Sequence, residues 1–155
     1  MLVDGDEIVF DSPVILEWLE RRAPDPPLYP NEPARRAEVG VFVDWFNNLW
    51  KRPPNLIAVE LEQPQPNAAR LDELASRMRA SLDVFEDLLD GRDYLFGEFG
   101  VADVTAFPFL KYAVFGTPPG DDELFHRILV EHMPLADGYP NLRAWVALVD
   151  AHPRS

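Results

Sequence analysis

VADVTAFPFLKYAV, residues 101–114, carries apolar side chains on nearly all sides when it is wound as a helix at about 100° per residue. A helix that is apolar all round lies in the interior of a protein, covered by other helices. Pro108 lies inside this stretch, so we expect it to kink the helix or to leave one carbonyl without its usual partner. The stretch predicts a mainly helical fold built around a central helix.

The segments on either side of this stretch also have helical patterns. Before it, an apolar stripe at helical spacing is followed by a stop signal at Gly91; the stripe consists of Leu71, Leu74, Ala75, Met78, Leu82, Phe85 and Leu89. Because the stripe is too short for a long coiled coil, it predicts packing within a bundle. After the central stretch we expect two further helices, over residues 121–132 and 141–151, the second stopped by Pro153.

A helix rich in aromatic residues comes earlier in the chain. It should begin beside Pro33 and run to about Trp50, where Pro53-Pro54 stops it. Its apolar residues cover roughly 200° of the circumference, about twice the stripe that a surface helix needs. They are Val41, Phe42, Val43, Trp45, Phe46, Leu49 and Trp50. One side can face the core, which leaves the rest for a ligand, a neighbouring domain or a second subunit; a purely central helix is the alternative.

The start of the chain has a strand pattern. Short β-type runs at residues 2–3 and 8–10 flank Asp4-Gly5-Asp6, which favours a hairpin turn. A helix should follow, with a capping side chain in Asp11-Ser12 ahead of Pro13, a proline suited to the first helical position. An isolated hairpin is marginal in water. We therefore interpret it as the tail of a larger sheet whose earlier strands lie outside this chain; a small hairpin docked on a helical domain is the alternative.

A proline-rich segment, residues 24–33, separates this start from the helical remainder. Such a segment is extended and semi-rigid and cannot continue a helix, so it is typical of a domain linker. We expect three parts: residues 1–23 with two strands and a helix, the linker over 24–33, and an all-helical domain over 34–155.

The amino-acid composition excludes or disfavours several classes of binding partner and site. A formal net charge of -13 disfavours nucleic acid and anionic membrane surfaces. The absence of cysteine excludes a disulfide or a thiol nucleophile within this chain and fits a cytoplasmic protein. No apolar run has the length of a membrane span, and the first residues lack the basic start of a secretory signal. None of His126, His132 and His152 has a partner at metal-ligand spacing, so we predict no metal site.

Four segments, in their order and spacing, resemble the glutathione transferase family: residues 3–19, 27–30, 94–104 and 139–145. They are similar to the last two strands and the following helix of that family's thioredoxin-like domain, to its interdomain linker, to its buried helix start and to its final helix. The resemblance implies a C-terminal helical bundle of glutathione transferase type, preceded by a hairpin-and-helix remnant of a thioredoxin-like domain.

The resemblance also implies a reaction and a set of ligands. In the family, the thiolate of glutathione, a co-substrate, attacks a small hydrophobic electrophile, and an acidic-Ser pair recognises the γ-glutamyl end of glutathione. Here that pair is Asp11 and Ser12, whose hydroxyl, carboxylate and helix-start N–H groups suit a carboxylate and an ammonium. The electrophile pocket would fall to Phe42, Trp45, Phe46, Trp50, Tyr112 and Phe115. A helix cap and core packing are the alternative roles of these two groups.

The chain departs from the family pattern in two respects. The family's sulfur-activating Ser, Cys or Tyr has no counterpart here, so we name no catalytic residue and expect this chain by itself to be inactive. Where the family usually has Ser or Thr three residues before a buried aspartate, this chain has Gly100 before Asp103. Asp103 is therefore predicted as a structural cap that lacks a reciprocal hydroxyl.

Two further functions stay open beside the transferase. The same type of domain also serves as a non-catalytic module for protein–protein interaction, and a redox member of the family would need a cysteine that this chain lacks. The broad aromatic arc and the strand edge at the start of the chain predict self-association, with a homodimer as the expected state.

Overall fold

The computed structural model describes residues 1–135 and 137–153 and has the mainly helical fold that the sequence predicts. Strands β1 (Leu2–Asp4) and β2 (Glu7–Val9) form an antiparallel hairpin in which Leu2 lies opposite Val9. The helices are α1 (Ser12–Arg22), α2 (Pro33–Trp45), α3 (Arg52–Leu61), α4 (Ala68–Leu88), α5 (Val101–Phe115), α6 (Leu124–His132) and α7 (Pro140–Asp150), with a π-helical segment η1 (Phe46–Trp50) between α2 and α3.

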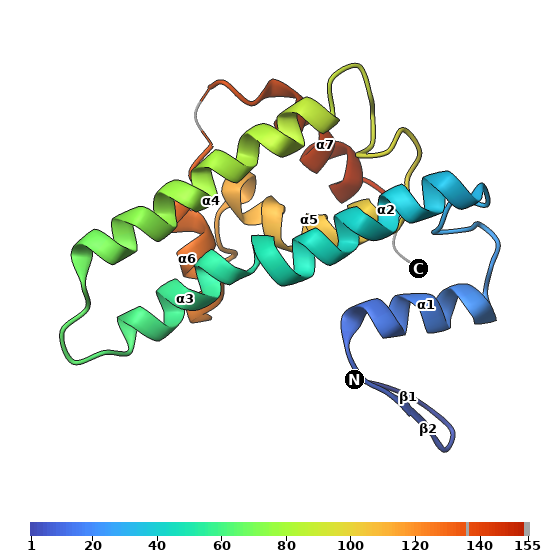
Figure 1. The fold of residues 1–155 in the computed structure, drawn as a ribbon, viewed down its shortest axis with the longest axis horizontal. Helices are drawn as coiled ribbons and strands as arrows, with labels where there is room; N and C mark the ends of the chain where they lie inside the picture. The colour runs from blue at the N-terminus through green and yellow to red at the C-terminus, as the bar shows by residue number, and fades with distance from the viewer. Residues whose placement is uncertain (136, 154–155) are drawn as a thin grey trace.

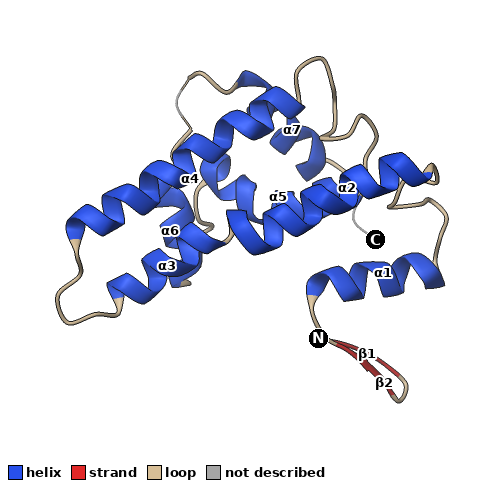
Figure 2. Ribbon diagram, viewed as in Figure 1, coloured by secondary structure: helices blue, strands red, loops and turns tan. Residues whose placement is uncertain are grey.

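Figure 1 shows the hairpin and α1 set to one side of the array formed by α2 to α7. The proline-rich linker joins the two parts, and Figure 2 shows that strands within the described part occur only in the hairpin. The carboxylate of Glu20 on α1 accepts hydrogen bonds from the N–H of Leu28 (2.8 Å) and from the N–H of Tyr29 (3.4 Å). These bonds tie the end of α1 to the linker and help to set the position of α1 beside the helical array.

Helix α5 is the centre of the array, as its sequence predicts. It contacts α2, α6 and α7, and the side chains of Val101, Ala106 and Leu110 are fully buried. The helix continues through Pro108, whose side chain is exposed, to its end at Phe115. Proline has no N–H to donate to the carbonyl of Val104, one turn earlier. The stripe predicted for residues 71–89 is α4, with Met78, Leu82 and Phe85 buried against the core.

The predicted helical stretch from Pro33 to about Trp50 is present, but its last turn is π-helical and the predicted stop at Pro53-Pro54 is wrong. Helix α2 ends at Trp45 and continues as the π-helical segment η1, and a further helix, α3, begins at Arg52. Proline is well tolerated in the first turn of a helix, because the N–H groups of that turn have no partner within the helix. The two prolines therefore lie at the start of α3 instead of ending the helical region.

None of the helices in the part of the chain that the structure describes combines the length and the apolar character that a membrane crossing needs. The division of the chain at residues 23 and 33 stays a prediction, and the last two residues of the third part lie outside the described residues.

Candidate functional site

A cleft of about 290 Å³ opens between the start of α1, the segment η1 and the middle of α5. It is bounded by Ser12, Pro13, Ile15, Leu16, Asn47, Lys51, Val104, Thr105, Pro108 and Phe109. These residues come from three separate stretches of the chain, and most of their side chains are apolar. A concave, largely apolar site with a few polar groups has the usual composition of a small-molecule site.

The predicted pair Asp11–Ser12 lies at one end of this cleft. Ser12 lines it, and Asp11 immediately precedes α1 with φ at 72°, in the left-handed region that non-glycine residues seldom occupy. The prediction of a capping side chain ahead of Pro13 is wrong, because α1 begins after Asp11 with no side-chain capping hydrogen bond. The Asp11 carboxylate thus remains exposed, and the strained backbone is of the kind that collects at functional sites.

The π-helical segment η1 supplies the opposite wall. Its wider turn is visible in the bond from the N–H of Lys51 to the carbonyl of Phe46, five residues earlier (3.1 Å). The Asn47 side chain donates from Nδ2 to the carbonyl of Val43 (3.0 Å) and accepts at Oδ1 from Nζ of Lys51 (2.7 Å). Asn47 thereby connects the backbone of α2 to the lysine ammonium at the cleft. Short π-helical segments occur often at functional sites.

Lys51 is half-buried and carries the positive charge of the cleft. Its Nζ lies 4.4 Å from the ring centroid of Phe109, which is a cation–π distance. Burial lowers the pKa of Lys51 from its ordinary value, while the negative charge of Asp11 acts in the opposite direction. The cleft thus presents an ammonium group between an aromatic ring and the site predicted for glutathione.

Two features of α5 border the same cleft. Thr105 is 9% exposed, and its hydroxyl has no hydrogen-bond partner among the described residues. Pro108 leaves the carbonyl of Val104 without the N–H that a regular helix would supply, and both residues line the cleft. An unpaired buried polar group costs about 1–3 kcal/mol of stability, so the polar groups in this turn of α5 lack hydrogen bonds that the rest of the helix has.

The aromatic residues predicted for an electrophile pocket lie largely in the core. Phe42, Phe46, Trp50 and Tyr112 are buried, and the ring of Phe46 stacks on that of Trp50 at 4.4 Å between centroids. Trp45 is half-buried beside Trp50 along a separate groove between η1 and α4, whereas Phe115 is exposed at the end of α5. None of the six lines the cleft beside Ser12. Their role in electrophile binding stays a prediction, and Phe109 provides the aromatic ring that the cleft does contain.

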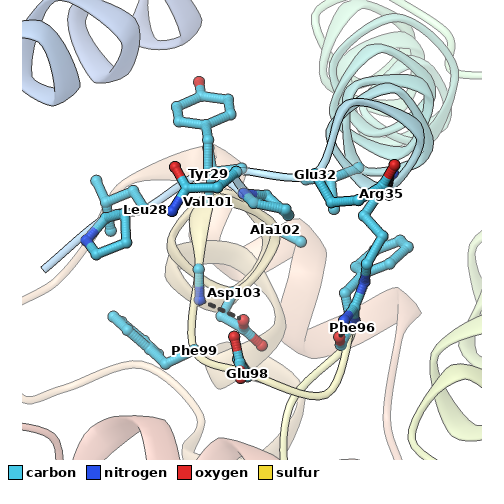
Figure 3. A pocket seen from close by; sticks show the side chains of 15 residues that line it. Leu28, Tyr29, Glu32, Arg35, Phe96, Glu98, Phe99, Val101, Ala102 and Asp103 are labelled. Carbon is cyan, nitrogen blue, oxygen red and sulfur yellow. Dashed lines mark hydrogen bonds between the residues drawn. The ribbon is translucent and has the colours of Figure 1, made fainter. Parts of the chain in front are cut away.

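Asp103 lies below a second cavity, of about 250 Å³, at the joint between the linker and α5. Its carboxylate accepts hydrogen bonds from the N–H of Leu95 (3.1 Å), the N–H of Gly100 (3.0 Å) and Nε1 of Trp145 (2.7 Å). Figure 3 shows this carboxylate and its bond to the backbone of the helix start. Arg35, which also lines this cavity, donates to the carbonyl of Phe96 (2.8 Å). Asp103 and Arg35 thus each have hydrogen-bond partners within the protein, which is typical of a structural joint.

The close approach of the linker explains why position 100 of this joint is a glycine. The N–H of the next residue, Val101, donates to the carbonyl of Leu28 in the linker (2.8 Å), and a Cβ at Gly100 would lie 2.8 Å from that oxygen. The serine or threonine that the family pattern predicts would therefore collide with the linker.

In residues 1–135 and 137–153, no group of three or more His, Cys, Asp or Glu side chains is placed to hold a metal ion. His126 on α6 instead lies with Nδ1 at 2.8 Å from the Asp121 carboxylate, which accepts its hydrogen bond, and at 3.0 Å from the hydroxyl of Tyr112 on α5.

Sequence reasoning located Ser12 but missed Asn47, Lys51, Thr105 and Phe109 as neighbours of the same cleft. The one local signal was the four-residue spacing of Asn47 and Lys51, which lets their side chains meet on a helix. Nothing local indicated that these two side chains would lie near the start of α1.

Comparisons with known proteins agree with this architecture. Residues 68–148 match the family model described as the C-terminal domain of glutathione S-transferase. A crystal structure of a glutathione S-transferase from Rhodospirillum rubrum superposes with a TM-score of 0.68 and 26% identity, covering 97% of this chain and 65% of that one.

Two curated relatives have other names. FtsZ-localized protein A of Caulobacter vibrioides is 30% identical over 124 residues, which are 74% of this chain and 54% of that protein. A stringent starvation protein A homolog of Haemophilus influenzae is 28% identical over 109 residues, which are 70% of this chain and 49% of that protein. The chain spans about half the length of the curated relatives it matches.

Proposed function

Because the chain belongs to the glutathione S-transferase family through its C-terminal domain, we propose that the cleft beside Ser12 is part of a site for glutathione and an electrophile. In this proposal the Ser12 hydroxyl and the N–H groups at the start of α1 bind the γ-glutamyl carboxylate. The exposed Asp11 carboxylate pairs with the ammonium of glutathione. The apolar wall formed by α1 and α5 receives the electrophile.

The observation that carries this proposal is the place of Ser12. It lies at the mouth of a cleft with apolar walls, next to a strained backbone that turns the Asp11 carboxylate out of the helix cap. A hydroxyl in this position can accept or donate to a ligand, and the first turn of α1 favours negative charge.

The reaction proposed for the site is the attack of the glutathione thiolate on an electrophilic carbon. The sulfur–carbon bond forms as the leaving group departs with its electron pair. The residues that line the cleft would orient the two substrates, which raises the effective concentration of the thiolate at the carbon. None of these residues is assigned as the donor that stabilises the thiolate. We therefore predict that the 155-residue chain gives no turnover above background with a general aryl halide.

Glutathione binding is the direct test of this proposal. We expect an NMR titration to detect weak binding, with shift changes around the start of α1. Ser12→Ala and Asp11→Asn should each weaken the binding by about tenfold, since a hydrogen bond to a charged group contributes roughly 1.5–3 kcal/mol. The matched control is Ser76→Ala, which removes an exposed hydroxyl from α4. Equal affinities in all four proteins would contradict the proposed site.

A non-catalytic interaction module is the second candidate. It is favoured by the names of the two curated relatives, neither of which describes a transferase, and by exposed apolar side chains on and directly after the hairpin, with Phe10 at 63% exposure. Because one relative is named for FtsZ, purified FtsZ is the first partner to test. Absence of glutathione shifts together with stable FtsZ binding would support the module over the transferase.

A further inference from the structure

Lys51 is the one charged side chain among the residues that line the cleft beside Ser12. An ammonium group has three N–H donors, and here one of them is used by Asn47 Oδ1. Lys51 forms no ion pair with any carboxylate in the described part of the chain; its ammonium also lies over the rings of Phe109 (4.4 Å) and Phe46 (5.6 Å). Two N–H donors of a half-buried cation are therefore directed to no protein acceptor.

The environment holds this cation in place. Asn47 is fixed by its bond to the Val43 carbonyl, so its Oδ1 is aimed at Lys51 rather than free to rotate. The ring of Phe109 lies beneath the ammonium on the other side. A positioned cation in a partly dry cleft binds an anion more strongly than a mobile lysine at the surface, because little side-chain entropy or water has to be lost on binding.

The other residues of the cleft indicate which kind of molecule would carry an anionic group to Lys51. Its remaining walls are mostly apolar, from Ile15, Leu16, Val104, Pro108 and Phe109, and they enclose a volume suited to a small molecule. The formal net charge of -13 repels anions at long range, so an anion that binds here must be selected by the local cation. No acidic side chain lines the cleft; the negative charge of Asp11, just outside it, acts on Lys51 without forming an ion pair in the described part of the chain.

We infer that the cleft binds aromatic carboxylates, with the carboxylate on Lys51 and the ring against Phe109 and the apolar wall of α1. The inference rests on the proposed function in one respect, since it names the class of electrophile that the transferase site would accept. Binding itself needs neither glutathione nor turnover.

The test is a calorimetric titration of the 155-residue chain with 2-naphthoate and, as the uncharged analogue of the same shape, 2-naphthamide. We expect naphthoate to bind at least tenfold more tightly than naphthamide, a difference that corresponds to about 1.4 kcal/mol. Lys51→Met should abolish this preference, and Lys51→Arg, which keeps the charge, should retain it. Circular dichroism checks that both variants are folded.

The chain offers a matched control, because Lys51 and Lys111 are its two lysines. Lys111 lies on α5 outside the cleft, with its ammonium against the ring of Tyr112. Lys111→Met should leave the naphthoate affinity unchanged. Equal affinity for naphthoate and naphthamide, no naphthoate binding in the millimolar range, or an equal loss in both methionine variants would each overturn the inference.

A final titration distinguishes two sources of the carboxylate. If glutathione occupied Lys51 with one of its own carboxylates, saturating glutathione would compete with naphthoate, and the assignment to the electrophile would be overturned. Independent binding of the two ligands supports it. Because the first titrations contain no glutathione, their failure leaves the test of the transferase site at Ser12 unaffected.

Discussion

Asp103 is the residue on which three segments of the helical array converge. Its buried carboxylate accepts from the N–H groups of Leu95 and Gly100 and from the indole of Trp145 on α7. Burial raises the pKa of this carboxyl group, and the three hydrogen bonds only partly oppose the effect. Asp103 therefore organises the start of α5 at the cost of placing an acidic group in the core.

This raised pKa predicts the sign of a pH effect on stability. The folded chain keeps the Asp103 proton at pH values where the unfolded chain, with an ordinary aspartate pKa of about 3.9, has released it. The contribution of Asp103 to the free energy of unfolding is thus complete below that pH and falls as the pH rises toward the folded-state pKa. Urea unfolding at a series of pH values should show this fall in the parent chain and not in Asp103→Asn.

The control for this measurement is Asp72→Asn, which removes an exposed carboxylate from α4. It should keep the pH dependence of the parent chain. In a separate measurement at neutral pH, Asp103→Asn should lower the free energy of unfolding by roughly 1–3 kcal/mol, because an amide cannot accept all three hydrogen bonds without placing its own donor against an N–H group. Identical pH slopes in the parent and the Asp103 variant would contradict the raised pKa.

At the scale of elements, the joint between the linker and α5 fixes the position of α1 relative to the helical array. The Leu28 carbonyl accepts from the start of α5, while the Leu28 N–H donates to Glu20 on α1. A single linker residue thus connects α1 to the central helix. Since the cleft lies between those same two helices, the geometry of the site depends on this joint.

Gly100→Ala should therefore destabilise the chain by about 1–3 kcal/mol, the usual effect of overpacking a close backbone contact. The added Cβ would lie 2.8 Å from the Leu28 oxygen, which is backbone and cannot rotate away. Thermal unfolding measures the effect. In the control, Gly40→Ala, the new methyl group meets no atom within 4 Å in the middle of α2, so stability should rise by roughly 0.5–1 kcal/mol. Equal changes in the two variants would contradict this account.

At the scale of the whole molecule, large apolar side chains remain exposed on the hairpin, on α1 and on α2. They include Val3, Ile8, Phe10, Val14 and Val41. The β1–β2 pair is also a two-stranded sheet, so each strand has an edge that pairs with no other described strand. Such surfaces favour association with another polypeptide, and we propose a second copy of this chain as the partner.

Light scattering should then give a mass near twice the 17.7 kDa of the chain, falling on dilution. Val41→Glu, at a side chain that is 70% exposed on α2, should shift the protein toward the monomer with little effect on folding. The matched control is Leu148→Glu, at a side chain that is 40% exposed on α7. A monomer mass at every concentration would refute the proposed dimer.

The sequence by itself determined the helical class, the central place of residues 101–114 and the buried stripe of α4. These follow from the spacing of apolar residues, which each helix carries locally and which the hydrophobic effect converts directly into burial. The sequence also located Ser12 at a helix start, because that signal lies within a few neighbouring residues.

Only the tertiary structure decided the site around Ser12. The cleft joins residues 12–16, 47–51 and 104–109, and contacts between distant segments are not encoded in the pattern of any one of them. The π-helical turn before Lys51 coincides with the stacking of Phe46 on Trp50 in the core, and α3 begins directly afterwards at Arg52 with the proline pair in its first turn. Local sequence rules assume regular helices, so they predicted the helical stretch to Trp50 but missed its π-helical last turn and the helix α3 that begins at Arg52.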